Sequence, residues 1–324
     1  MRRRDFSITL VTLVALSGAL LGLGQSAGAE ETIKVSVPQR GAWDTGVTEL
    51  GQRAGIFKKH GLAVEILYTQ GGAESIQAVI SGSMDIATGV GVSAAVSTYA
   101  KGAPIRLIGS EMIGSPDLFW YVLPNSPVQK ISDLNDKTIA YSVNGSSSHA
   151  ALLELLAQYK LTAKPVSAGG MPVTLTQAMT AQVDVGWAAA PFALDLLDEG
   201  KIRLVARGSD VDALRGRTVR VNVTNLDMLS KRREALDRFM QAYRETVDWM
   251  YSDPAALKHY SEFSGLPEKI VVRVRDFIPK ETILPERIVG MDQILADAMK
   301  LKFIQTSLTP EQMKEMVQIA TPAN

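Results

Sequence analysis

The chain has 324 residues, of which 46% are hydrophobic, 34 are basic and 34 are acidic, and none is cysteine. The lack of cysteine excludes disulfides, thiolate catalysis, iron–sulfur clusters and a lipidated N-terminal cysteine. The balanced charge, with no basic stripe, argues against nucleic-acid binding. A chain of this length can bury one large core or two smaller ones.

The N-terminus has the features of an export signal. Three arginines at positions 2–4 precede an apolar stretch from Ile8 to Leu23, and Ala27-Gly28-Ala29 follows. This is the n-region, h-region and A-x-A order of a cleavable signal peptide, and the stretch is shorter than the roughly 20 residues that span a bilayer. We therefore expect residues 1–29 to be removed by cleavage after Ala29 and the mature chain to reside in the periplasm. Arg3-Arg4-x-Phe6 also resembles a twin-arginine signal, so both export routes stay open.

Strands and helices alternate in the first part of the mature chain. The expected elements are strand 33–37, helix 47–57, strand 64–69, helix 74–81, strand 85–87, helix 93–100 and strand 105–108. Asp44 or Thr45 can cap the first helix, and Gly61 supplies a left-handed residue that turns the chain after it. Such alternation predicts a parallel sheet.

The sequence contains an internal echo. Residues 77–86 (QAVISGSMDI) resemble residues 177–185 (QAMTAQVDV), and each segment ends in an aspartate that opens a strand. A second matching strand follows in each copy, Ile105–Ile108 in the first and Ile202–Val205 in the second. Two matches in the same order and at similar spacing indicate two lobes that are built alike.

The second half completes this two-lobed plan. The chain is expected to cross between the lobes at residues 111–116 and 123–127. A strand at 138–142 and a helix at 147–159 are expected before the second copy of the echo, and a strand at 219–223 is expected to cross back. The remaining chain is helical and includes a capping box at 309–312. We predict an α/β fold in which residues 30–113 plus 223–324 form lobe I, residues 114–222 form lobe II, and two crossing strands join the lobes.

In open parallel sheets, ligands bind beyond the carboxyl ends of the strands. The loops expected there supply the candidate ligand-binding residues Arg40, Trp43, Gly71, Gly72, Thr88, Gly89, Ser93, Glu111, Asn144, Gly145, Ser146, Ser147, Ser148 and Trp187. The serine run opens a helix, so its hydroxyls and free backbone N–H groups can hold an oxyanion, although a single serine suffices for an ordinary N-cap. Each tryptophan either stacks on the ligand or packs in the core. Arg40 either pairs with an anion or lies on the surface.

The sequence resembles the solute-binding proteins of nitrate, sulfonate and taurine type ABC importers, within the thiamine-pyrimidine-synthase-like superfamily. The resemblance rests on residues 54–62 (AGIFKKHGL), Gly71-Gly72, residues 82–87 (GSMDIA), and the lead from Pro124 to Lys137. It implies a type II periplasmic-binding-protein fold, a cleft that closes on the solute, an inner-membrane ABC permease as partner, and a monomer without catalytic activity. Ala190 stands where many relatives have an acidic residue, and together with the serine run this favours a small organic anion.

Two other functions remain open from the sequence. An exported dinucleotide-binding oxidoreductase would use Gly89-x-Gly91-x-x-Ala94, which follows a strand, with Glu111 about 20 residues further on. A ligand-sensing subunit of a receptor would use the same cleft to signal. No cluster of residues predicts a metal site, and no cofactor is expected.

Overall fold

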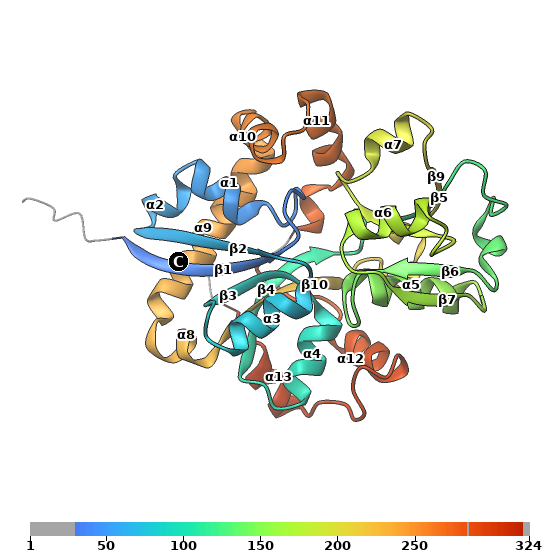
Figure 1. Cartoon of the computed structure of the whole chain (residues 1–324). Coiled ribbons are helices and arrows are strands. Elements are labelled where there is room, and N and C mark those ends of the chain that lie inside the picture. Colours follow the sequence, from blue (N-terminus) through green and yellow to red (C-terminus); the bar gives the residue numbers. More distant parts are fainter. Residues whose placement is uncertain (1–29, 284, 320–324) are drawn as a thin grey trace, which may run out of the picture.

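The computed structural model describes residues 30–283 and 285–319, so the expected export signal and its cleavage site lie outside the described residues. The chain folds into two α/β lobes that lie side by side (Figure 1). Of the helices in these two described ranges, none is long and apolar enough to cross a membrane.

Lobe I contains a five-stranded sheet in the order β2-β1-β3-β10-β4. Its strands are β1 (Glu31–Pro38), β2 (Leu62–Thr69), β3 (Ile86–Gly91), β4 (Ile105–Ile113) and β10 (Thr218–Asn225). β1 pairs in parallel with β2 and β3, whereas β10 runs antiparallel to β3 and β4. Every residue of β3 and β10 is buried, as expected for central strands covered on both faces.

Lobe II repeats this arrangement. Its strands are β5 (Leu118–Val122), β6 (Thr138–Tyr141), β7 (Lys164–Ser167), β8 (Gly186–Ala189) and β9 (Arg203–Arg207). β5 lies antiparallel between β8 and β9, β6 pairs in parallel with β7, and a parallel bridge between Ile139 and Val185 joins the two groups. The resulting order β7-β6-β8-β5-β9 corresponds strand by strand to that of lobe I.

The internal echo in the sequence marks equivalent positions of the two lobes. Asp85 immediately precedes β3, and Asp184 lies two residues before β8. Each accepts a hydrogen bond of 2.8 Å from the backbone N–H of a residue in the neighbouring strand, Lys34 and Thr138 respectively. Each aspartate thus ties the start of one strand to the strand beside it. The two-lobed plan predicted from the sequence is confirmed.

Thirteen α-helices of the described ranges cover the sheets. They are α1 (Val47–Arg53), α2 (Ile56–Lys59), α3 (Gly72–Ile80), α4 (Val92–Ala100), α5 (Ser147–Gln158), α6 (Met171–Met179), α7 (Leu194–Asp198), α8 (Leu226–Lys231), α9 (Arg233–Ser252), α10 (Ala255–Ser264), α11 (Glu268–Phe277), α12 (Met291–Lys300) and α13 (Pro310–Met316). The expected helix 47–57 is interrupted because Gly55 adopts a left-handed φ of 72°. Its N-cap is Gly46, with no side-chain hydrogen bond, so neither Asp44 nor Thr45 caps it.

The crossings between the lobes are short. β4 ends at Ile113 in lobe I and β5 begins at Leu118 in lobe II, so the segment 123–127, expected at a crossing, instead follows the first strand of lobe II. The return connection leads into β10, all of which pairs in the sheet of lobe I. The expected boundary between residues 222 and 223 therefore falls inside β10.

The C-terminal helices belong to lobe I and reach across to lobe II on two sides of the junction, α11 at the top and α12 at the bottom of Figure 1. Arg273 of α11 forms an ion pair with Asp198 of α7. Lys300 of α12 lies 3.0 Å from a carboxylate oxygen of Glu154 in α5. These ion pairs connect the two lobes on both sides of the junction.

Candidate functional site

A cavity of about 70 Å³ lies between the lobes. Its lining residues are Pro38, Gln39, Ala42, Asp44, Thr45, Gly71, Gly72, Gly89, Gly91, Asp117, Leu118, Ser142, Ser146, Ser147, Ser148, Met171, Trp187, Ala189 and Arg220. Most come from the carboxyl ends of strands and the loops that follow, in both lobes, whereas Asp117, Leu118 and Arg220 lie at the starts of β5 and β10, which run antiparallel to their neighbours. A molecule in this cavity therefore contacts both lobes at once.

Three helices point their N-termini at the cavity. Gly71 and Gly72 begin α3, Ser146–Ser148 begin α5, and Met171 begins α6, and all of them line the cavity. The first N–H groups of a helix have no partner within the helix, and the helix dipole adds partial positive charge at this end. The arrangement favours an anionic group in the cavity.

The serine run has a defined internal structure. Ser146 is the N-cap of α5, and its hydroxyl accepts a hydrogen bond of 3.2 Å from the backbone N–H of His149. The hydroxyl of Ser148 accepts one of 3.0 Å from the backbone N–H of Ser142. Ser147 accepts one of 3.0 Å from Nε of Arg220, a residue of the other lobe. The run therefore serves both to cap the helix and to connect the lobes.

Arg220 on β10 is the centre of a buried ionic cluster. One terminal nitrogen of its guanidinium donates to Asp44 over 2.7 Å, and the other donates to Asp117 over 2.6 Å. Burial by itself lowers the pKa of Arg220, but the carboxylates of Asp117 and Asp44 outweigh burial and raise it. The guanidinium remains charged and links lobe I, the crossing segment and lobe II.

Glu111 lies behind this cluster, fully buried in β4. Burial and the nearby Asp44 carboxylate raise the pKa of Glu111 well above its usual range. Burial also raises the pKa of Asp117, although Arg220 opposes this effect. The two carboxyl oxygens of Glu111 have no hydrogen-bond partner among the described residues.

Seven of the fourteen predicted site residues come together around the cavity. They are Gly71, Gly72, Gly89, Ser146, Ser147, Ser148 and Trp187. Three of these are glycines at which the backbone itself forms the wall. Gly89 requires its glycine most clearly, because its φ is +67° and a Cβ there would lie 2.8 Å from Thr45.

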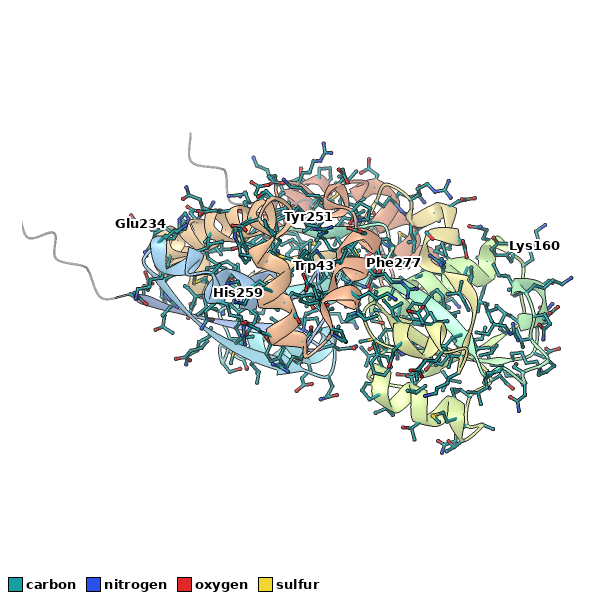
Figure 2. All side chains as sticks on the ribbon, turned by 90° about the horizontal axis from the view of Figure 1, so that it is seen from above. Trp43, Lys160, Glu234, Tyr251, His259 and Phe277 are labelled. Atoms are coloured by element: carbon teal, nitrogen blue, oxygen red, sulfur yellow. The ribbon has the colours of Figure 1, made fainter. Side chains whose placement is uncertain are left out.

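The other seven predicted residues lie elsewhere: Arg40, Trp43, Thr88, Ser93, Glu111, Asn144 and Gly145. Trp43 is in the core of lobe I, where its indole N–H donates to the hydroxyl of Tyr251 over 3.0 Å, and Figure 2 shows the two side chains close together. Thr88 is buried in β3, and Asn144 accepts a hydrogen bond from the Tyr141 hydroxyl. Ser93 and Gly145 line a smaller neighbouring cavity between the lobes.

Arg40 lines a larger outer chamber of about 800 Å³ between α6 and α7 of lobe II and the end of α10 in lobe I. Its guanidinium lies 4.7 Å from the ring centroid of Phe263. The chamber has mostly apolar walls, including Leu175, Phe192 and Ile270, and shares Ala42 and Met171 with the inner cavity. The chamber and the inner cavity are therefore neighbours.

The sequence analysis missed the ionic cluster. Arg220 and Asp117 were not named, and Asp44 was interpreted as a helix cap. One signal was present: Arg220 is the one charged residue in a strand where valines alternate with polar residues, and a charged residue in a buried strand is almost always paired. Its partners come from positions 44 and 117, so the sequence alone did not identify them. The glycines of the dinucleotide-like pattern have a packing role, since a Cβ on Gly91 would meet Gly145 of the other lobe at 2.6 Å.

Two lobes of equal strand order that enclose a polar cavity define a periplasmic-binding-protein fold. The sequence model of the NMT1/THI5-like family matches residues 49–257, and the chain belongs to this family. A comparison with curated proteins found no match.

Solved structures of similar fold agree with this assignment. The alkanesulfonate-binding protein SsuA from Xanthomonas axonopodis pv. citri bound to MOPS matches with a TM-score of 0.74 and 20% identity, covering 89% of this chain and 98% of that one. The periplasmic aliphatic sulphonate-binding protein SsuA from Escherichia coli has a TM-score of 0.71 and 17% identity, with coverage of 91% and 94%. The periplasmic nitrate-binding protein NrtA from Synechocystis PCC 6803 has a TM-score of 0.70 and 11% identity, with coverage of 89% and 86%.

Proposed function

We propose that this protein captures a small organic anion in the inter-lobe cavity and delivers it to the permease of an ABC importer in the inner membrane. The observation that carries the proposal is the convergence of three helix N-termini on a cavity shared by both lobes. The similar structures named above are sulfonate- and nitrate-binding proteins, which supports an anionic solute. We further propose that the protein is exported with cleavage after Ala29 and resides in the periplasm. We propose that it acts there as a monomer.

The contacts between the lobes suggest how capture works. The lobes meet through the Arg220–Ser147 hydrogen bond, the Lys300–Glu154 ion pair and the stacking of Arg207 over Phe277, whose ring centroid lies 5.2 Å away. Phe277 lies at the junction of the lobes in Figure 2. Opening the junction breaks these contacts and exposes the cavity. A solute that contacts both lobes supplies the free energy that favours the closed form.

The first experiment is a thermal-shift screen of the mature protein with nitrate, bicarbonate, sulfonates, and aliphatic and aromatic carboxylates. A stabilising anion is expected, because a solute that binds only the folded state raises the melting temperature. The double variant Ser146→Ala/Ser147→Ala should bind that anion at least about tenfold more weakly, since each hydroxyl that bonds a charged group contributes on the order of 1.5–3 kcal/mol.

Loss of Ser146 also removes a helix cap, so the experiment needs a matched control. Thr309 caps α13 in the same way, with its hydroxyl accepting from the backbone N–H of Gln312, and it does not line the cavity. Thr309→Ala should cost similar stability, about 1 kcal/mol, but leave affinity unchanged. Equal affinity of wild type and the double serine variant would refute the role assigned to the serine run.

A further inference from the structure

His149 lies at the junction of the lobes, directly after the serine run, but it does not line the inner cavity. Its imidazole ring stacks on the ring of Tyr141 in lobe II, with the two centroids 4.1 Å apart. The edge of Phe303, which follows α12 in lobe I, faces the same imidazole at 5.4 Å. The carbonyl oxygen of Phe303 accepts a hydrogen bond of 2.7 Å from the Ser97 hydroxyl in α4. The imidazole is therefore held between one aromatic ring of each lobe.

One ring nitrogen of His149 serves as a hydrogen-bond acceptor. Nδ1 accepts a hydrogen bond of 3.1 Å from the backbone N–H of Gly145. An imidazole nitrogen can accept only while it carries no proton, and both ring nitrogens of a charged histidine are donors. Protonation of Nδ1 would place two donors opposite each other and break this hydrogen bond. The contact with Gly145 therefore requires a neutral imidazole.

Gly145 is also a point at which the lobes touch. Its carbonyl oxygen lies so close to Gly91 of lobe I that a Cβ there would meet it at 2.6 Å. A Cβ on Gly145 would in turn lie 3.1 Å from the side chain of Ala94 in α4. The hydrogen bond to His149 fixes Gly145 in this contact and fixes the start of α5 with it. Its loss would disturb the lobe contact and the serine run together.

The charged groups beside the imidazole are basic. A cleft of about 430 Å³ borders the ring, where α4 contributes Lys101, the turn after α12 contributes Lys302, and α3 contributes no titratable residue. Among the described residues that line this cleft, none is acidic. Burial raises the pKa of Tyr141 beneath the ring, so its hydroxyl carries no charge. An imidazolium at this position finds no carboxylate to stabilise it.

Closure of the lobes therefore disfavours the charged form of His149. Burial lowers the pKa of its imidazole to about 4. The acidic residue of α5 itself, Glu154, is paired with Lys300. Opening the lobes withdraws Phe303 and admits water to the ring, which returns the pKa toward its ordinary value of about 6.5. The open form thus binds a proton more tightly than the closed form does.

We propose that His149 is a pH-sensitive latch, whose neutral imidazole is required by the closed form and whose protonation opens the lobes. This inference rests on the proposed function and adds regulation by pH to the same cleft. The sign follows from linkage: protons favour the state that binds them more tightly, here the open one. Solute affinity is fully present above about pH 6.5 and falls as the pH drops from there toward 4.

The test is calorimetry on mature wild type and His149→Gln at about pH 7.5 and 5.5. The probes are nitrate, ethanesulfonate, benzenesulfonate, propanoate and benzoate. A glutamine oxygen can still accept from Gly145 but does not titrate in this range. The ionic cluster and the probes titrate alike in both proteins, so the difference between the proteins isolates the imidazole. Wild type should lose affinity about three- to tenfold more than the variant at the lower pH, and the two should agree within about twofold at the higher pH.

His259→Gln is the matched control, because His259 lies on α10 of lobe I and lines neither the cavity nor the cleft. It should keep the full pH dependence of wild type. An excess loss in wild type below about twofold, or the same loss of pH dependence in His259→Gln, overturns the latch and leaves the proposed function standing. If none of the five anions binds at either pH, the proposed function itself fails.

Proton NMR of wild type gives a second measurement that does not depend on a variant's folding. The chain has three histidines, so few imidazole signals need assignment. The pKa of His149 should be lower in the presence of a saturating bound probe than in its absence, because the probe favours the closed form. Equal pKa values of His149 in the two states would contradict the latch.

Discussion

Gly91 lies where the two lobes touch, and its replacement by alanine tests whether the described conformation is the closed, solute-binding one. A Cβ on Gly91 would lie 2.6 Å from the carbonyl oxygen of Gly145, 3.0 Å from the nitrogen of Ser147 and 3.1 Å from the carbonyl carbon of Ser146. All three atoms are backbone atoms of lobe II, so they do not move aside as a flexible side chain would. The backbone of Gly91 itself suits alanine, with φ −59° and ψ 128°.

The size of the effect follows from these distances. Ordinary contacts of a Cβ begin near 3.4 Å, so the lobes must separate by about 0.8 Å at Gly145. Overpacking of this kind typically costs about 1–3 kcal/mol. Because the clash exists only when the lobes meet, it falls on the closed form, and solute affinity should drop by a factor of about 5–150. The stability of the open, solute-free protein should stay within about 1 kcal/mol of wild type.

Gly170 of lobe II provides the matched control, because it does not line the cavity and its Cβ would meet the side chain of Gln70 in lobe I at an ordinary 3.5 Å. Like Gly91 it is a helix N-cap, and its backbone, with φ −69° and ψ 161°, suits alanine. Calorimetry with the solute found by screening should show weakened binding for Gly91→Ala and nearly normal binding for Gly170→Ala. Small-angle scattering should show that solute compacts wild type more than Gly91→Ala. Unchanged affinity in Gly91→Ala, or an equal loss in Gly170→Ala, would refute the assignment of this contact to the closed form.

Two further predictions concern stability. Arg220→Met should lower the free energy of unfolding by about 3–5 kcal/mol in urea titrations, because Asp44 and Asp117 stay buried without their cation. A loss below about 1 kcal/mol would show that the cluster does not stabilise the fold. Burial lowers the pKa of His149 to about 4, so the unfolded chain binds a proton between about pH 6.5 and 4 that the folded chain does not, and stability falls as the pH drops through this window. His149→Gln should remove on the order of 1–2 kcal/mol of that acid loss, after discounting for solvent near the ring, and an equally steep pH dependence in the variant would contradict this origin.

Much of the fold was predictable because it depends on local patterns. The helix and strand periods, the left-handed glycines such as Gly61, and the capping box at Thr309 act over a few residues and appear directly in the sequence. The echo ending in Asp85 and Asp184 predicted the repeated lobes, since each aspartate fixes the same local junction of strands. β5 and β7 were not predicted, and residues 123–127 were expected at a crossing although they follow β5.

The candidate site was predictable only in part. The serine run, the paired glycines and Trp187 were predicted at the cavity because they lie in loops that follow strands, and a parallel sheet brings such loops to one edge. Trp43 belongs to a loop of the same kind, but its ring turns into the core beside Tyr251, 208 residues away in the chain. Whether a loop side chain faces the cleft or the core depends on partners distant in sequence, and no local pattern encodes that choice.

The sequence by itself determined the two-lobed α/β plan, the lack of thiol chemistry and the helix start that can hold an anion, because composition and short-range spacing fix these properties. Only the tertiary structure revealed the ionic cluster, in which Arg220 meets Asp117 from 103 positions and Asp44 from 176 positions earlier in the chain. Such long-range pairs form when the lobes pack. The ionic cluster beside the cavity is therefore a property of the assembled lobes.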